Sequence, residues 1–200
     1  LAAAQAVCDF GFWVLDFGLD ENARPESKLE NPKLDVLAAL TELVDNNLLL
    51  QEEADSEPRF GMLATIREYA LERLAESGEQ PALERRHAGF FRDVAETNRA
   101  ELRGPAQGQW FARWERDHDN VRAALGWALG AGEVELALRL GCALWRFWYG
   151  HGHLHEGRQW LERGLAAAHE APAGIAAALR AQVLHALGTF VTAQTDYAQA

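Results

Sequence analysis

Three histidines alternate along the segment GHGHLHEG, at His151, His153 and His155. Imidazole nitrogens bind transition metals, and short histidine-rich tracts form metal sites in many proteins. This segment, however, contains no cysteine or aspartate, and Gly150 and Gly152 are typical of a tight turn where two helices approach closely. We therefore interpret the segment as an exposed turn between helices, and we predict no metal ligands in the chain.

No combination of residues typical of an active site is recognisable elsewhere. His87 and His185 fall in segments expected to be helical, where satisfied polar histidines are more common than catalytic ones. A Ser/His/Asp or Cys/His arrangement for nucleophilic catalysis is not recognisable. The phosphate-binding patterns GxxxxGKS and GxxxxGKT do not occur. We expect these residues to catalyse no reaction and to bind no cofactor.

Length and composition are those of one large or two small domains. Of the 200 residues, 48% are hydrophobic, and seven Trp and nine Phe need packing partners.

No run of 18 apolar residues occurs that could cross a membrane, and the start of the chain lacks the basic region of a signal peptide. Cys8 and Cys142 lie far apart in apolar segments, which favours two free buried thiols over a disulfide. We expect a cytoplasmic protein whose first residues are the end of a helix.

The net charge of −11 is unevenly distributed along the chain. Residues 1–80 hold 17 acidic and 6 basic side chains, whereas residues 81–200 hold 13 of each. All the excess negative charge therefore lies in the first part. We interpret this difference as evidence for two modules, and it bears directly on nucleic-acid binding.

The elements that position these residues are predicted to be helices and one β-hairpin. Apolar residues at helical spacing indicate helices over residues 34–47 and 64–77, the second closed by Gly78. In the second helix we expect one apolar stripe to face a core, formed by Ile66, Tyr69, Ala70, Leu71 and Leu74. Two strands, residues 48–52 and 59–63, are expected between these helices, joined by the acidic loop EADSEP. Helix, strand, acidic loop and strand form the second half of a winged helix.

The chain is therefore interpreted as a mostly α protein of two modules. Residues 1–80 are predicted to form a winged-helix module with a two-stranded wing, although the turn-rich residues 9–33 have no assigned conformation. Residues 81–200 are predicted to be helical throughout. The helices expected there run from Pro81 to about Arg103, over residues 107–117 and 119–129, and onward from Val134.

The last third of the sequence is repetitive. The segment ALRLGCALWRFWYGHGHLHEGRQWLERGL is typical of helix, tight turn and helix, and ALRAQVLHALGTFVTAQTDYAQA begins the same unit again. With residues 187–188 at positions seven and eight of a tetratricopeptide unit, Tyr197 and Ala200 take positions seventeen and twenty, as the motif requires. The units start 43 residues apart, near Leu138 and Ala181, and the connection AAAHEAPAG accounts for the excess over the usual ~34. We predict antiparallel tetratricopeptide-like repeats, cut within the second unit and continuing beyond it.

In tetratricopeptide arrays the first helix of each pair lines the concave face, chiefly through positions two, five, nine and twelve. Most residues at these positions here are polar and poorly explained as core. Two of them are arginines that could meet an acidic group on a partner. We predict that an inducer or a partner protein binds a surface formed by Arg139, Cys142, Arg146, Tyr149, Gln182, His185, Thr189 and Thr192.

Six tryptophans of the helical part have two alternative interpretations. They fall on apolar stripes, which favours packing between helices. The alternative is that they line a groove for a ligand or a peptide. The six are Trp110, Trp114, Trp127, Trp145, Trp148 and Trp160.

Several segments also resemble, in the right order, a family of regulators. MLATIREYA, at residues 62–70, resembles the motif that ends the winged-helix module of STAND-class (NB-ARC-like) signalling ATPases. More closely, LLLQ, EPRFGMLATIREYALERL, RRHAGFF and DHDNVRAALGWAL resemble bacterial LuxR- and AfsR-type regulators of that class. The resemblance covers most of the chain from about Leu37. It implies that an upstream nucleotide-binding domain, holding ATP or ADP, precedes a winged helix and tetratricopeptide-like helices.

The resemblance points to a strand-to-helix junction where many STAND proteins carry Met-His-Asp, and where the histidine reaches the ADP phosphate. The matching residues here are Met62, Leu63 and Ala64. Leu63 has no hydrogen-bond donor and Ala64 has no charge, so a direct phosphate contact is not expected. Any coupling to nucleotide would use other groups, such as Arg67, or packing alone.

A winged helix can bind DNA through the helix that precedes its wing. In the helix expected over residues 34–47, however, the charged residues are Asp35, Glu42 and Asp45, and the wing is acidic as well. DNA phosphates require Lys or Arg and are repelled by an acidic face. We therefore predict no direct nucleic-acid binding. The resemblance implies instead that the winged helix packs on the nucleotide-binding domain and helps to hold a closed state.

The sequence thus predicts the non-enzymatic, regulatory part of a bacterial STAND-type transcription regulator. An inducer or partner protein would bind the helical repeats and change how the winged helix packs on the upstream ATPase domain. The alternative is a helical-repeat scaffold for protein–protein interaction, without a nucleotide-linked switch. A phosphate-binding loop encoded upstream of Leu1 would favour the regulator.

Overall fold

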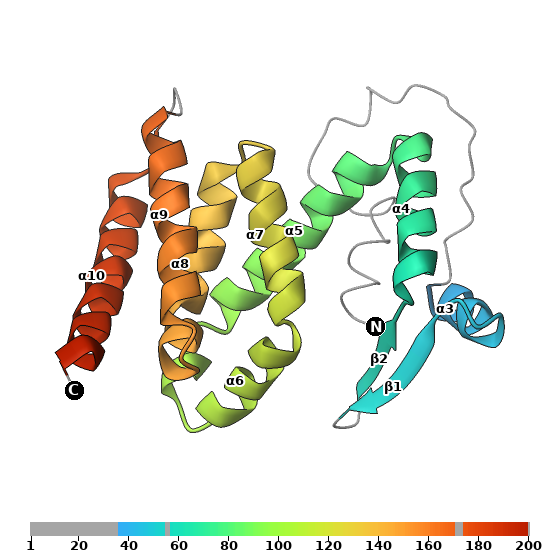
Figure 1. Cartoon of the computed structure of the whole chain (residues 1–200), viewed down its shortest axis with the longest axis horizontal. Coiled ribbons are helices and arrows are strands. Elements are labelled where there is room, and N and C mark those ends of the chain that lie inside the picture. The colour runs from blue at the N-terminus through green and yellow to red at the C-terminus, as the bar shows by residue number, and fades with distance from the viewer. Residues whose placement is uncertain (1–35, 55–56, 171–173, 200) are drawn as a thin grey trace, which may run out of the picture. The chain divides into compact units, whose positions relative to one another are not determined.

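The computed structural model describes residues 36–54, 57–170 and 174–199, and most of these residues are helical. Eight α-helices and one two-stranded antiparallel sheet lie within the described ranges (Figure 1). The mostly α fold with a single hairpin is therefore as predicted. By its internal contacts the chain divides into two compact units, residues 1–86 and 87–200.

The first unit contains the helix and hairpin that were predicted as the second half of a winged helix. Helix α3 (Val36–Asp45) precedes strands β1 (Leu50–Ala54) and β2 (Glu57–Gly61), and helix α4 (Ala64–Ser77) follows them. Helix α4 has the predicted bounds, because Gly78 adopts the left-handed conformation that ends it, with φ 75°.

Strand β1 begins two residues later than predicted. The backbone N–H groups of Leu48 and Leu49 both donate to the carbonyl of Leu43, at 2.9 and 3.2 Å, and Asn47 has a positive φ of 57°. These bonds complete the end of helix α3, so strand pairing starts only at Leu50. Much of the segment expected as an acidic loop is paired within the strands instead.

The apolar stripe of α4 is narrower than predicted. Ile66, Ala70 and Leu74 are half-buried, but Tyr69 is 62% exposed and Leu71 is 44% exposed. Successive helical residues point about 100° apart, so three consecutive residues cannot all face the same side. The prediction that Tyr69 and Leu71 face a core is therefore wrong.

In the described residues of the second unit the regular elements are all helices, joined by short turns, as predicted. In Figure 1 its last four helices stand side by side, and α10 packs against both α8 and α9. The elements from the end of the first unit onward are α5 (Gln80–Thr97), the 3₁₀ helix η1 (Glu101–Arg103), α6 (Gln107–Arg116), α7 (His118–Gly130), α8 (Val134–Gly150), α9 (Leu154–Glu170) and α10 (Ala177–Gln199).

Two helix boundaries in this part differ from the prediction. The helix expected to reach Arg103 ends at Thr97, because the side chain of Asn98 donates to the carbonyl of Val94 at 2.9 Å and a 3₁₀ turn follows. Helix α9 extends to Glu170, so the AAAHE part of the predicted connection is helical, in keeping with its good helix formers. The tetratricopeptide register itself stays a prediction.

Helix α8 provides the largest share of the buried core of the second unit. Glycines allow the neighbouring helices to pack closely against α8. A Cβ atom added at Gly157 of α9, for example, would meet Trp148 of α8 and Phe190 of α10. Gly150 likewise faces Phe111, as expected for a turn where helices approach closely. The packing interpretation of the six tryptophans is confirmed, since Trp114, Trp145 and Trp148 are buried in this core and Trp110, Trp127 and Trp160 pack against it.

Some predictions fall on residues outside the described ranges. The expected helix end at residues 1–8, the unassigned residues 9–33 and the thiol of Cys8 are among them. The free buried thiol predicted at Cys142 is confirmed.

Within the described ranges, no helix combines the length and apolar character needed to cross a membrane.

Candidate functional site

Arg146 is the residue of the predicted binding surface whose surroundings most clearly leave it available to a partner. Its guanidinium lies over the ring of Trp145, 4.2 Å from the centroid. Its Nε is buried with no hydrogen-bond partner among the described residues. Burial lowers the pKa of Arg146, and the nearby charges of Arg103 and Arg99 lower it further. The residue is therefore a cation surrounded by other cations, a setting that favours binding of an anion.

Arg139 and Cys142, by contrast, are engaged within the fold. Arg139 donates from Nε and Nη2 to the two carboxylate oxygens of Glu96, at 2.7 Å each, and the hydrogen bond to Glu96 raises the pKa of Arg139. Cys142 is 2% exposed, and burial raises the pKa of its thiol to about 12. A neutral, buried thiol offers no surface and little reactivity. The structure thus removes Cys142 from the predicted surface and assigns Arg139 to an ion pair with α5.

Four other predicted residues come together at an open groove between α8 and α10. The hydroxyls of Thr189 and Thr192 bond to the carbonyls four residues earlier, at 3.0 and 2.9 Å, so their hydrogen-bonding needs are met within α10. The ring of His185 meets Trp145 edge-on, with 5.8 Å between centroids. The groove holds about 490 Å³ and is lined by Tyr149, Leu184, His185, Gly188, Thr189, Thr192 and Ala193.

Gln182 links this groove to the arginines. The Nη1 of Arg99 donates to Oε1 of Gln182 at 3.2 Å, and Gln182 lies one helical turn before His185. An arginine-rich end, formed by Arg146 of α8 with Arg99 and Arg103 from the segment after α5, therefore adjoins a groove with aromatic and hydroxyl groups. We call the surface of Arg99, Arg103, Arg146, Tyr149, Gln182, His185, Thr189 and Thr192 the α8–α10 face.

The predicted nucleotide-sensing junction lies at the start of α4. Leu63 is the N-cap residue, with no side-chain hydrogen bond, and is 53% exposed. Met62 is half-buried, and Ala64 and Arg67 are exposed. These side chains carry no phosphate-binding group other than Arg67, as the sequence indicated. Coupling through this junction stays a prediction.

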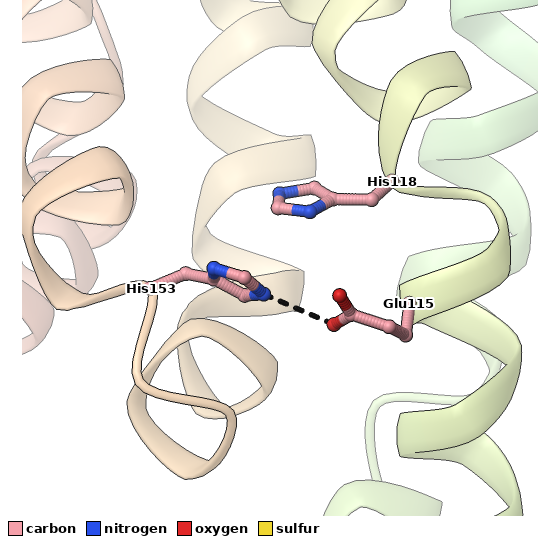
Figure 2. Close-up of side chains that lie close together, drawn as sticks. All are labelled: Glu115, His118 and His153. Carbon is pink, nitrogen blue, oxygen red and sulfur yellow. Dashed lines mark hydrogen bonds and ion pairs between the residues drawn. The ribbon is translucent and has the colours of Figure 1, made fainter.

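A second cluster, which the sequence analysis missed, lies beside the turn between α8 and α9. Figure 2 shows Glu115 of α6, His118 of α7 and His153 converging, and one donor atom of each lies within 4.8 Å of the others. The Oε2 of Glu115 is 3.0 Å from Nε2 of His153 and 3.1 Å from Nδ1 of His151. The sequence argument against a metal site relied on the absence of cysteine and aspartate from the histidine segment. That reason is insufficient, because the carboxylate of Glu115 meets the segment from 38 residues before His153.

His118 is the buried member of this cluster, at 5% exposure. Its Nε2 lies 3.2 Å from Oε1 of Glu156, but without the alignment of a hydrogen bond. Burial lowers the pKa of His118, while the hydrogen bond from His153 lowers the pKa of Glu115. At neutral pH the cluster therefore combines a neutral imidazole with an ionised carboxylate. Besides the alternating histidines, the spacing of Glu115 and His118 in WERDH was a sequence signal of this site.

Comparisons with known proteins point to transcription. No protein-family model matches the chain, and no solved structure matches it. Relatives from Mycobacterium tuberculosis and Mycobacterium bovis, each named "Putative HTH-type transcriptional regulator", are 38% identical to the chain over 128 residues. The match covers 62% of this chain and 14% of each relative, so the chain corresponds to a small part of their length. The similarity supports a role for this chain in transcription regulation.

Proposed function

We propose that this chain is the signal-receiving part of a bacterial STAND-type transcription regulator. In this proposal the first unit is a winged helix that contacts an upstream nucleotide-binding domain, and the helical unit binds the signal. Its support is the similarity to HTH-type regulators, together with the order of helix, hairpin and helices. The chain itself performs no catalysis, and ATP or ADP binds to the upstream domain.

The observation that carries the binding role is the state of Arg146. Its guanidinium stacks on Trp145, its Nε lacks a hydrogen-bond partner among the described residues, and two further arginines lie close by. A carboxylate or phosphate brought by a partner would supply the missing hydrogen bond and offset the mutual repulsion of these cations. The inducer is therefore an acidic small molecule or an acidic segment of a protein.

The signal is transmitted as a shift between two populations of the regulator. A ligand changes such an equilibrium only by its differential affinity for the two states. Binding at the α8–α10 face favours the state in which the winged helix releases the nucleotide-binding domain. By linkage, nucleotide exchange upstream then changes the affinity of this face for its inducer by the same factor.

DNA binding belongs to another part of the regulator in this proposal. The acidic side chains of α3 in the described range are Glu42 and Asp45, and its sequence VLAALTELVD has no basic residue. Such a helix has no group that neutralises phosphate. The winged helix therefore acts by contact with protein.

The experiment is a transcription reporter assay on the full-length parent carrying Arg146→Gln. We expect the variant to lose most of the inducer response while the parent keeps its basal level and its folded helical content. Arg180→Gln is the matched control, because Arg180 is exposed on the same helix as Gln182 but about 160° around it. An unchanged response in Arg146→Gln, or an equal loss in Arg180→Gln, contradicts the assignment.

Arg139→Gln separates binding from stability in the same assay. Arg139 is paired with Glu96, so this variant should have a slightly lower melting temperature. The protein that stays folded should respond to the inducer as the unchanged regulator does. Circular dichroism melting of each variant checks this distinction.

A helical-repeat scaffold without a nucleotide-linked switch is the second candidate. The binding face itself favours this candidate, since a surface that binds a partner needs no nucleotide-linked switch. The gene upstream of Leu1 distinguishes the two functions: a GxxxxGKS or GxxxxGKT loop within a few hundred residues is expected for the regulator, and its absence favours the scaffold.

A further inference from the structure

Three helix ends bring a carboxylate and two imidazoles together in the second unit. Glu115 lies near the end of α6, His118 begins α7, and His153 directly precedes α9. One donor atom of each lies within 4.8 Å of the others, and the three side chains point toward one another in Figure 2. Two imidazoles and one carboxylate form a recurring protein ligand set for transition metals, with a position left open for a further ligand.

The state of His118 is the second, independent observation. The side chain is 5% exposed, and its Nε2 has no hydrogen-bond partner among the described residues. Buried polar groups are nearly always hydrogen-bonded, and the carboxylate that Nε2 faces is that of Glu156, 3.2 Å away, so the other ring nitrogen is left for a ligand. The ring packs against Phe147 and His153, with centroids 5.3 and 4.5 Å apart, which holds it facing the other two donors.

Glu156 provides the outer support that metal-binding histidines usually have. Its carboxylate receives Nε and Nη2 of Arg122 at 2.8 Å each, and Nε1 of Trp160 at 3.3 Å, which fixes its position. Oε1 of Glu156 lies 3.2 Å from Nε2 of His118. A small rotation of the ring makes this contact a hydrogen bond from Nε2–H to Glu156. The other ring nitrogen, Nδ1, then carries the lone pair that can bind a metal ion. A carboxylate behind a histidine in this way orients the ring and raises its basicity as a ligand.

We propose that Glu115, His118 and His153 form a binding site for one divalent transition-metal ion, with Zn²⁺ the preferred occupant. Imidazole donors suit Zn²⁺, Ni²⁺ and Cu²⁺, whereas Mg²⁺ and Ca²⁺ require oxygen ligands in greater number. His151, 3.1 Å from the same carboxylate oxygen, is placed to supply a fourth ligand.

The cluster can contract to the size of a zinc site. Donor atoms around tetrahedral Zn²⁺ are roughly 3.3 Å apart, as follows from bonds of about 2.0 Å. Glu115 is an exposed side chain at the end of a helix, and His153 lies in a turn that contains Gly152 with φ 80°. Both can move toward His118 without disturbing the core. The ion would fasten α6, α7 and the α8–α9 turn together, independently of the function proposed above.

The test is calorimetric titration of the untagged, chelator-treated 200-residue chain with ZnCl₂. We expect one saturable site per chain, a rise in melting temperature with added Zn²⁺, and no binding of Mg²⁺. Co²⁺ in place of Zn²⁺ should give visible absorption bands typical of a tetrahedral site with nitrogen and oxygen ligands. Failure to saturate near one equivalent overturns the site.

The variants decide which residues hold the ion. His153→Ala and Glu115→Gln should each weaken Zn²⁺ binding at least tenfold, and neither side chain is needed for the buried core. His155→Ala is the matched control, since His155 is an exposed histidine nearby whose ring hydrogen-bonds to Gln159. Binding by His155→Ala should remain within twofold of the unchanged chain. Equal losses in His155→Ala and His153→Ala, or full binding by Glu115→Gln, indicate that the three residues form only a hydrogen-bonded contact and overturn the proposal.

Discussion

Some arginines of the helical unit form ion pairs with carboxylates of the same chain, and Arg146 has other surroundings. Arg122 and Arg139 each hold a carboxylate with two short hydrogen bonds, to Glu156 and Glu96. Such bidentate pairs fix geometry between helices. Arg146 has the opposite surroundings, a ring beneath it and arginines beside it. A side chain held in position without a counter-charge is suited to bind a molecule from outside.

Glu156 gives a pH prediction at the level of a single side chain. Its hydrogen bond from Arg122 lowers its pKa from 4.5 to about 2. A carboxyl whose pKa is lower in the folded state stabilises the fold above pH 4.5, and this contribution is lost as the pH falls toward 2. Because the side chain is partly exposed, we expect the contribution to be roughly 1–2 kcal/mol.

Urea unfolding of the chain and of Glu156→Gln at several pH values measures this contribution. The difference in unfolding free energy between the two should be largest near pH 6 and should shrink as the pH falls from 4.5 toward 2. Glu162→Gln is the control, since the pair of Glu162 with Arg158 is exposed to solvent and its loss should have a small effect. A difference that stays constant with pH would show that Arg122 does not act through the ionised carboxylate.

At the level of elements, close packing of α9 on α8 depends on small residues. An alanine Cβ at Gly157 would lie 2.8 Å from Cε3 of Trp148 and 2.9 Å from Cζ of Phe190. These rings are fully buried and cannot withdraw without opening the core. We expect Gly157→Ala to lower the unfolding free energy by about 1–3 kcal/mol, as overpacking does in other cores.

Gly89→Ala is the matched control for this prediction. Gly89 lies within helix α5 with no heavy atom within 4 Å of an added Cβ. Alanine there should raise the unfolding free energy by about 0.5–1 kcal/mol through its higher helix propensity. Thermal and urea unfolding of both variants measure these changes in unfolding free energy, which should have opposite signs. Equal changes in the two variants would contradict the packing argument.

Local signals in the sequence were enough to predict most elements. Gly78 fixed the end of α4, and the acidic segment EADSEP placed the turn of the hairpin, with each strand predicted to within two residues. The end of α5 was missed because it depends on one side-chain bond, from Asn98 to Val94, which periodicity does not register. The spacing of apolar residues alone therefore cannot predict helix ends that depend on a single side-chain hydrogen bond.

The functional residues were predicted less completely than the elements. Helical spacing correctly grouped Tyr149 with His185 on one groove, because both follow from the faces of α8 and α10. The same spacing could not reveal that Cys142 is buried. Nor could it pair Glu115 with His153, since residues 38 positions apart meet only through packing of the helices.

At the level of the whole molecule, charge separates the two parts of the chain. Residues 1–80 carry the entire excess of negative charge, and residues 81–200 have equal numbers of acidic and basic residues. The arginines of the α8–α10 face are therefore a local concentration of positive charge in a unit that is neutral as a whole. A face of this kind selects a compact acidic group rather than a long polyanion.

Duplex DNA tests that conclusion directly. A protein that binds DNA through phosphates binds more tightly as salt is lowered, with log K falling linearly against log salt concentration. Since the described helix α3 has no basic residue and the net charge is −11, we expect no binding by the 200-residue chain, measured by fluorescence anisotropy, at 150 mM or at 50 mM salt. The full-length parent is the positive control, since its separate DNA-binding domain should bind its operator in the same assay. Binding by the chain alone that strengthens tenfold or more between the two salt concentrations would mean that its arginines act on phosphates, and the α8–α10 face would then have to be reinterpreted as a nucleic-acid surface.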